Sequence, residues 1–194
     1  LRDLHERFPD IRLELDTNAT LRDLGAGEAD IALRSTSREQ PAGTVGRIIC
    51  QDDWTLYCSR DYAERYGVPK TRDGLKRHTI VAGGGGNLAR VYGQWLHDLG
   101  LEDQIAMEQG SSGGLLTAVR AGVGIAALPC IVADADPDLI RCVPPVHHDR
   151  KTWLLTHERV RHSPAVRAVI DFLYDRLMAH VRQVETRRAE LILP

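Results

Sequence analysis

Apolar residues recur at helical spacing at the very start of the chain and then alternate with polar residues. Leu1, Leu4 and Phe8 share one helical face, and Phe8 is followed by Pro9, which ends the helix. No capping residue precedes Leu1, so the chain is expected to begin inside a helix of a larger protein. Strict alternation over residues 11–15 then predicts a half-buried strand.

The next two elements complete a supersecondary unit. Residues 17–20, Thr-Asn-Ala-Thr, offer capping side chains for a short helix that ends at Gly25 or Gly27. The apolar run at residues 30–34 predicts a strand buried on both faces. A strand, a helix and a strand within so few residues predict a compact βαβ unit with parallel strands.

Strands and helices go on alternating after a polar loop at residues 35–46, which predicts an α/β fold. A polar break at residues 51–53 separates two strand-like runs and is typical of a segment that crosses between two lobes. The further expected strands are residues 48–50, 54–58, 79–82, 105–108, 125–128, 139–143 and 153–156, and the expected helices are residues 61–67, 87–99, 111–121 and 164–181.

Composition places the chain among globular proteins that are not themselves nucleic-acid binders. Hydrophobic residues make up 43% and charged residues 27%, and the formal net charge is −2. A domain that grips phosphate backbones is usually clearly basic, so any contact with DNA must be made by another part of the protein. No apolar run reaches the roughly 18 residues of a membrane span, and no secretory signal opens the chain.

The cysteines do not form a metal or redox motif. Cys50, Cys58, Cys130 and Cys142 contain no C-x-x-C pair and no zinc-finger spacing. Buried free thiols are the simplest interpretation of those in apolar segments, which favours a cytosolic protein.

A run of four glycines, residues 83–86, falls between a predicted strand and a predicted helix. It is not a phosphate-binding P-loop, because Asn87-Leu88 follows where Lys and Ser or Thr are needed. No acidic residue follows at the distance that a dinucleotide site requires. Two alternatives remain, a ligand-facing loop with accessible backbone N–H groups and a merely flexible connection.

Hydroxyl side chains recur where helices are expected to begin. Ser111 and Ser112 precede one helix and Thr17 and Asn18 another, so ordinary N-capping and anion binding are both possible. Arg34 ends a predicted buried strand and could pair with an anionic ligand. In open α/β sheets ligands bind outside the carboxyl ends of strands, and all of these positions, with the glycine run, are expected there.

Catalytic and metal-binding patterns are weak. His147, His148 and Asp149 form a polar, proline-flanked run without a ligand at helical spacing, which favours a solvated loop over a metal site. There is no G-x-S-x-G nucleophile elbow, and no base can be placed beside Ser111 or Cys130. Asp52-Asp53 is most simply a strand break. We therefore expect neither an enzyme, nor a metal, nor a cofactor.

The order of the segments resembles the effector-binding domain of LysR-type transcriptional regulators. The resemblance covers residues 1 to about 182 and lies in the order and spacing of the segments more than in any single one. The matching segments are FPDIRLEL, LRDLGAGEADIALR, VGRIICQDDWTLYCSRDYAERYG, LKRHTIV, SSGGLLTAVRAGVGIAALPCIVA, DLIRCVPPV and WLLTHERVRHSPAVRAVIDFL.

The resemblance implies a two-lobed fold like that of the type 2 periplasmic binding proteins, with two crossover segments and the effector held between the lobes. Lobe I would comprise residues 1–51 and 143–194, and lobe II residues 52–142. The winged helix-turn-helix, the linker helix and the first strand of such regulators would lie outside this chain. The tail at residues 185–194 lies beyond the resemblance.

Function follows from the resemblance as an expectation. The domain would bind a small, anionic metabolite, form a homodimer or homotetramer, and alter DNA binding by the absent N-terminal domain in the cytoplasm. A periplasmic solute-binding receptor of the same fold, a small-molecule enzyme and a pure oligomerisation module remain as alternatives. The expected ligand-binding residues are Thr17, Asn18, Arg34, Ser35, Ala82, Gly83, Gly84, Ser111 and Ser112.

Overall fold

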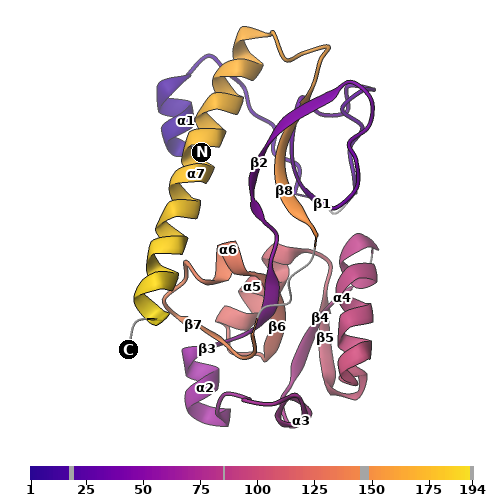
Figure 1. Ribbon diagram of the computed structural model, residues 1–194, viewed down its shortest axis with the longest axis vertical. Helices are drawn as coiled ribbons and strands as arrows, with labels where there is room; N and C mark the ends of the chain where they lie inside the picture. Colours follow the sequence, from indigo (N-terminus) through magenta and orange to yellow (C-terminus); the bar gives the residue numbers. More distant parts are fainter. Residues whose placement is uncertain (18–19, 85, 145–148, 193–194) are drawn as a thin grey trace. The chain divides into compact units, whose positions relative to one another are not determined.

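The protein is a mixed α/β structure with two separate sheets, as the sequence predicts (Figure 1). The computed structural model describes residues 1–17, 20–84, 86–144 and 149–192. The chain divides into two compact units. Unit 1 comprises Leu1–Asp16, Leu21–Asp52 and Asp149–Ala189, and unit 2 comprises Asp53–His148 with the short pieces Thr17–Thr20 and Glu190–Pro194.

Unit 1 contains a three-stranded antiparallel sheet with the order β1-β8-β2. Its strands are β1 (Ile31–Thr36), β2 (Thr44–Gln51) and β8 (Lys151–His157). The central strand is the most buried, and Leu155 at its middle is 0% exposed. A register shift between Ile48 and Cys50 marks a β-bulge in β2.

Two helices accompany this sheet. Helix α7 (Pro164–Ile192) begins at a proline, whose missing N–H is tolerated in the first turn of a helix. Helix α1 (Arg2–Arg7) buries Leu4, which confirms the helical pattern at the start of the sequence. An ion pair between Asp3 and Arg176 ties α1 to α7, and the two helices lie side by side in Figure 1.

The predicted strand at residues 11–15 and the helix after it are wrong. Residues 11–17 have no regular secondary structure, and Leu15 is 68% exposed, because this alternating segment pairs with no strand in the part of the chain that the structure describes. In place of the helix, the Asp23 carboxylate accepts hydrogen bonds from the N–H groups of Gly25 and Ala26. Such side-chain bonds compete with helix formation and produce a turn.

The predicted parallel βαβ unit is therefore also wrong. Strand β1 runs antiparallel to β8, its only partner among the described strands, and it is an edge strand. It is not buried on both faces, since Leu33 is 55% exposed. The apolar run at residues 30–34 correctly predicts a strand. The burial of that strand depends on which elements cover its two faces.

Unit 2 contains a five-stranded mixed sheet with the order β5-β4-β6-β3-β7. Strand β4 pairs in parallel with β5 and β6, whereas β3 pairs antiparallel with β6 and β7. The strands are β3 (Trp54–Ser59), β4 (Ile80–Gly83), β5 (Ile105–Gln109), β6 (Ile125–Pro129) and β7 (Leu139–Arg141).

Three helices of unit 2 begin at capping residues that the sequence provides. The side chains of Ser59, Thr71 and Ser111 each accept a backbone N–H of the following turn. Gly122, with φ of 71°, ends the helix that Ser111 begins. The helices are α2 (Arg60–Tyr66), α3 (Arg72–Leu75), α4 (Gly86–Leu99), α5 (Ser112–Arg120), α6 (Cys130–Ala133) and a 3-10 turn (Glu102–Gln104).

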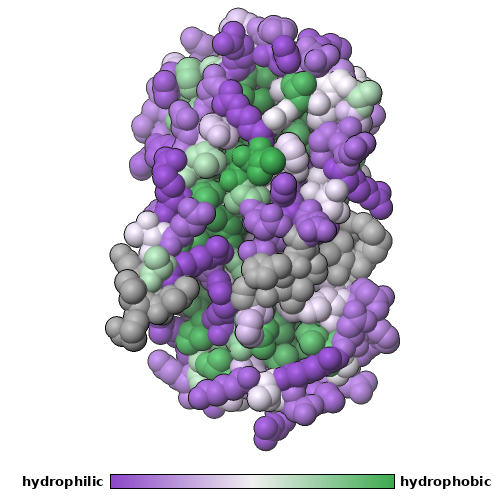
Figure 2. Space-filling model, in the orientation of Figure 1, coloured by the Kyte–Doolittle hydropathy of each residue, from purple (hydrophilic) through white to green (hydrophobic). Residues whose placement is uncertain are grey.

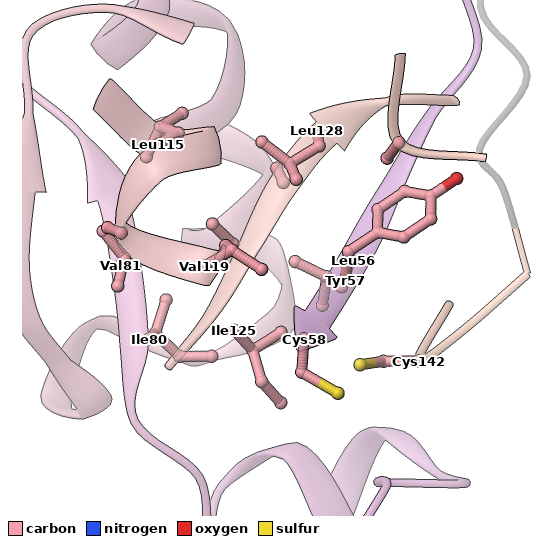
Figure 3. Packing of buried hydrophobic residues seen from close by; sticks show 14 of the residues in the cluster. Leu56, Tyr57, Cys58, Ile80, Val81, Leu115, Val119, Ile125, Leu128 and Cys142 are labelled. Atoms are coloured by element: carbon pink, nitrogen blue, oxygen red, sulfur yellow. The ribbon is translucent and has the colours of Figure 1, made fainter. Parts of the chain in front are cut away.

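The core of unit 2 lies between its sheet and α5 (Figure 3). Ile80 of β4 and Ile125 of β6 are fully buried, as is Val119 of α5. Burying a side chain of this size stabilises the fold by about 1.5–3 kcal/mol, so this cluster holds the parallel strands in place.

Apolar patches still interrupt the mostly hydrophilic surface in Figure 2. None of the described helices is long and apolar enough to span a bilayer.

Candidate functional site

Two predicted site segments meet at one edge of the unit 2 sheet. Parallel strands end at the same edge, and the register pairs Ala82 with Glu108 and Gly83 with Gln109. The N–H of Gly84 donates to the carbonyl of Gln109 at 2.9 Å. Helix α5 starts just after β5, so its first turn lies at this edge too.

The first turn of α5 provides polar groups suited to an anion. The Ser111 hydroxyl oxygen accepts the N–H of Gly114 at 3.1 Å, which confirms the N-capping alternative. Ser112 is exposed, and its hydroxyl makes no hydrogen bond within the described part of the chain. The remaining N–H groups of the turn carry the positive end of the helix dipole.

The glycine segment contributes backbone alone to this edge. A Cβ atom added to Gly84 would lie 3.0 Å from the side chain of Glu108, so the segment has little room for larger residues. The nearest side chain is thus a carboxylate. Because it repels negative ligands, any preference for an anion at this edge must come from the first turn of α5.

In unit 1, Ser35 belongs to a polar cluster that joins three chain segments. Its hydroxyl donates to the carboxylate of Asp52. The Arg150 guanidinium contacts the carbonyl of Ser35 through Nη2 at 3.0 Å and the Asp52 carboxylate through Nε at 3.3 Å. Asp52 is 3% exposed, so the arginine compensates a carboxylate that is withdrawn from water.

Sheet register explains why this cluster forms. Gln51 at the end of β2 pairs with Lys151 at the start of β8. Asp52 follows Gln51 and Arg150 precedes Lys151, so the two residues lie next to each other just beyond the sheet. The N–H of Asp52 also donates to the carbonyl of Arg150 at 3.0 Å. The cluster therefore ties the end of the unit 1 segment at Asp52 to the start of the next unit 1 segment at Asp149.

The other predicted residues do not lie where the sequence places them. Arg34 is in the middle of β1 rather than at its end, and its guanidinium donates to the carbonyl of Arg22. Thr17 is exposed in an irregular segment, not at a strand-to-helix junction. Asn18, like His147 and His148, lies outside the described residues. The prediction that all the sites lie at carboxyl ends of strands is therefore wrong for Arg34 and Thr17.

A second buried polar cluster supports unit 2. The Tyr57 hydroxyl donates to the Asp134 carboxylate at 2.6 Å, and Arg141 contacts the same carboxylate at 2.5 Å. Burial, reinforced by the hydrogen bond to Asp134, raises the pKa of Tyr57, so the phenol stays neutral.

All four cysteines are free thiols. No group of three metal-ligating side chains occurs among residues 1–17, 20–84, 86–144 and 149–192.

A family model decides the family. The model of the LysR substrate binding domain matches residues 1–178. The chain belongs to this family. Among curated proteins, an HTH-type transcriptional regulator of Xanthomonas campestris pv. campestris (strain 8004) is 33% identical over 82 residues. That match covers 42% of this chain and 24% of the regulator, so the chain corresponds to a part of its length.

Solved LysR-type domains share the fold. The effector domain of the transcriptional regulator AmpR of Pseudomonas aeruginosa is 23% identical with a TM-score of 0.64, over 94% of this chain and 88% of that one. The regulatory domain of CrgA, a LysR-type transcriptional regulator from Neisseria meningitidis, is 20% identical with a TM-score of 0.66, over 91% and 89%. Full-length AphB of Vibrio cholerae has a TM-score of 0.58, and the match covers 60% of its chain.

These findings establish a LysR-type effector-binding domain with the two-lobed fold that resembles periplasmic binding proteins. The relatives named above are transcriptional regulators. Sequence reasoning missed Arg150 and interpreted Asp52 only as a strand break. The available signal for this ion pair was the position of Asp52 between two apolar strands, because a buried carboxylate needs a cationic partner.

Proposed function

We propose that this LysR-type domain binds a small anionic metabolite and thereby changes how the complete regulator engages DNA. Binding is expected to start at the first turn of α5, where N–H groups and serine hydroxyls lie beside the glycine segment. Arg34 and the other polar groups of the predicted set are expected to contribute further contacts. The proposed ligand-binding residues are Thr17, Asn18, Arg34, Ser35, Ala82, Gly83, Gly84, Ser111 and Ser112.

One observation carries the proposal: α5 begins at the edge where β4 and β5 end. Ser112 offers an exposed hydroxyl there without a partner among the described residues, and Ser111 keeps its own hydroxyl proton while it caps the helix. A carboxylate with two oxygens can accept bonds from such donors. Gly83 and Gly84 allow a ligand to approach the backbone closely.

In mechanism, the metabolite acts by shifting an equilibrium between conformations. A ligand shifts a population only through a difference in its affinity for the two states. The Ser35, Asp52 and Arg150 cluster lies where the chain passes out of unit 1 and back, so it is placed to transmit such a shift. We propose that the domain works in the cytoplasm as a homodimer or homotetramer, with DNA bound through an N-terminal domain.

A thermal-shift screen of carboxylates, amino acids and aromatic acids tests the proposal. A true ligand at 100 times its Kd stabilises the folded state by about 2.7 kcal/mol. Ser112→Ala should weaken binding by about tenfold. Thr117→Val serves as the matched control, because Thr117 is exposed on the same helix but its hydroxyl already donates to the carbonyl of Gly113 at 2.9 Å. Equal loss in both variants, or no stabilising anion, would contradict the proposal.

A further inference from the structure

A polar cavity lies in unit 2 at the end of β4 opposite to the proposed effector site. It has a volume of about 390 Å³ and is lined by the end of α2, the segment after it, α3 and the turn that follows α3. His78 lines it just before β4 begins, whereas the proposed effector site lies after β4 ends. Tyr66, Lys70, Thr71, Arg77 and His78 provide its polar groups.

Two of these groups are cations without a partner in the described structure. Neither Lys70 nor Arg77 forms an ion pair or a side-chain hydrogen bond there, and both are exposed. The neighbouring cations differ, because Lys76 lies 3.7 Å from Asp73 and Arg72 donates to the carbonyl of Leu99. No carboxylate is among the described residues that line the cavity. Its charge is therefore uncompensated.

Thr71 and His78 also provide hydrogen-bond donors. The Thr71 oxygen accepts the N–H of Gly74 at 3.1 Å, which leaves the hydroxyl proton to be donated. The Tyr62 hydroxyl accepts the N–H of Thr79 and lies 3.2 Å from His78 Nδ1. Since the phenol proton has no other acceptor among the described residues, Tyr62 donates to Nδ1.

This bond determines what His78 presents to the cavity. With Nδ1 accepting, the neutral imidazole carries its proton on Nε2 and acts there as a donor. Burial, together with the charge of Arg77, lowers the pKa of His78, which favours the neutral ring. Lys70, Thr71, Arg77 and His78 thus each provide a hydrogen-bond donor to the cavity, and the exposed ring of Tyr66 also lines it.

We propose that this cavity is a second ligand site, which binds a phosphomonoester through Lys70, Thr71, Arg77 and His78 and packs its organic group against Tyr66. Four donor side chains, two of them cationic, match the three terminal oxygens of a phosphate better than the two oxygens of a carboxylate. A ring of Tyr66 that is 63% exposed offers a flat apolar face for the remainder of the ligand.

Phenyl phosphate and inorganic phosphate are the probes, titrated into the ¹⁵N-labelled chain at constant ionic strength. We expect saturable shifts of the amides at residues 66–78, with phenyl phosphate bound more tightly. Lys70→Ala and Arg77→Ala should each raise its Kd by about tenfold. Lys76→Ala is the matched control and should leave the Kd unchanged. Both cations are exposed, so a melting temperature near that of the parent is expected for these variants.

Two further measurements test individual parts of the proposal. Tyr66→Ala should abolish the difference between the two probes. A long-range ¹H–¹⁵N spectrum should show His78 protonated on Nε2 and shifted by phosphate. Unsaturable shifts, an equal effect of Lys76→Ala, equal affinity of the two probes for the parent, or a proton on Nδ1 would each overturn the site as proposed.

Discussion

The Arg150 guanidinium lies 3.3 Å from the carboxylate of Asp52, and the two side chains are 18% and 4% exposed. Ser35 bonds to both of them through its hydroxyl. A carboxylate buried to this degree depends on its cation, because desolvation without a partner costs several kcal/mol. The pair therefore stabilises unit 1 at the points where the chain leaves and re-enters it.

Removing one member of this pair should destabilise the protein. Arg150→Met leaves Asp52 buried without its cation, and we expect a loss of about 2–4 kcal/mol in the free energy of unfolding. Urea denaturation followed by circular dichroism measures it. Combining Arg150→Met with Asp52→Asn should restore part of the loss. Additive losses in the double variant would contradict a direct interaction.

The Thr55 hydroxyl ties β3 to the segment that follows β7. Thr55 is 0% exposed, and its hydroxyl donates to the carbonyl of Val143 at 2.7 Å and contacts that of Pro144 at 3.1 Å. Thr55→Val keeps the shape but leaves these carbonyls short of a donor, so we expect a loss of about 1–3 kcal/mol. Thr55→Ser retains the hydroxyl and should recover the hydrogen-bond part of the loss in the same denaturation assay.

Capping by Ser111 should be measurable apart from ligand binding. Ser111→Ala removes the acceptor for the N–H of Gly114 and should cost about 1 kcal/mol in the free energy of unfolding. Ser111→Asn supplies another capping oxygen and should cost much less. A comparable loss in both variants would show that the hydroxyl has a different role.

Two glycines of unit 2 should respond to alanine with opposite signs. A Cβ atom at Gly124 would lie 2.5 Å from the carbonyl oxygen of Thr79, so Gly124→Ala should destabilise by about 1–3 kcal/mol. At Gly93, inside α4, nothing lies within 4 Å, and Gly93→Ala should stabilise by about 1 kcal/mol. Melting temperatures of the two variants should move in opposite directions.

His78 should make folding stability depend on pH. Its pKa is lowered in the folded state by burial and by Arg77, so the unfolded chain binds the proton more readily. The resulting stability is present above the unfolded pKa of about 6.5 and is lost as the pH falls through the lower folded value. His78→Gln should reduce the loss of stability between pH 7 and pH 5. An unchanged pH profile would contradict this prediction.

The sequence predicted unit 2 well, because each of its elements carries its own local signals. Ser111 caps α5, Gly122 ends it, and the apolar runs around Ile80 and Ile125 form strands as expected. The parallel arrangement then brings Gly83 and Ser111 to one edge. For this half of the candidate site, local pattern and tertiary structure agree.

Unit 1 shows what the sequence alone leaves open. Alternation at residues 11–15 has the strand period, yet a strand forms only where another strand accepts its backbone groups. Leu33 lies in a real strand but stays exposed, since coverage of a face depends on distant segments.

The sequence by itself determined the α/β class, most helices, and the family resemblance, all of which rest on local spacing and segment order. Only the tertiary structure decided that β1 is antiparallel, that Arg34 lies mid-strand, and that Arg150 joins Asp52 across 98 positions of the sequence. The reason is physical: a partner for a buried charge or a strand edge is chosen by packing in space, and periodicity along the chain does not record it.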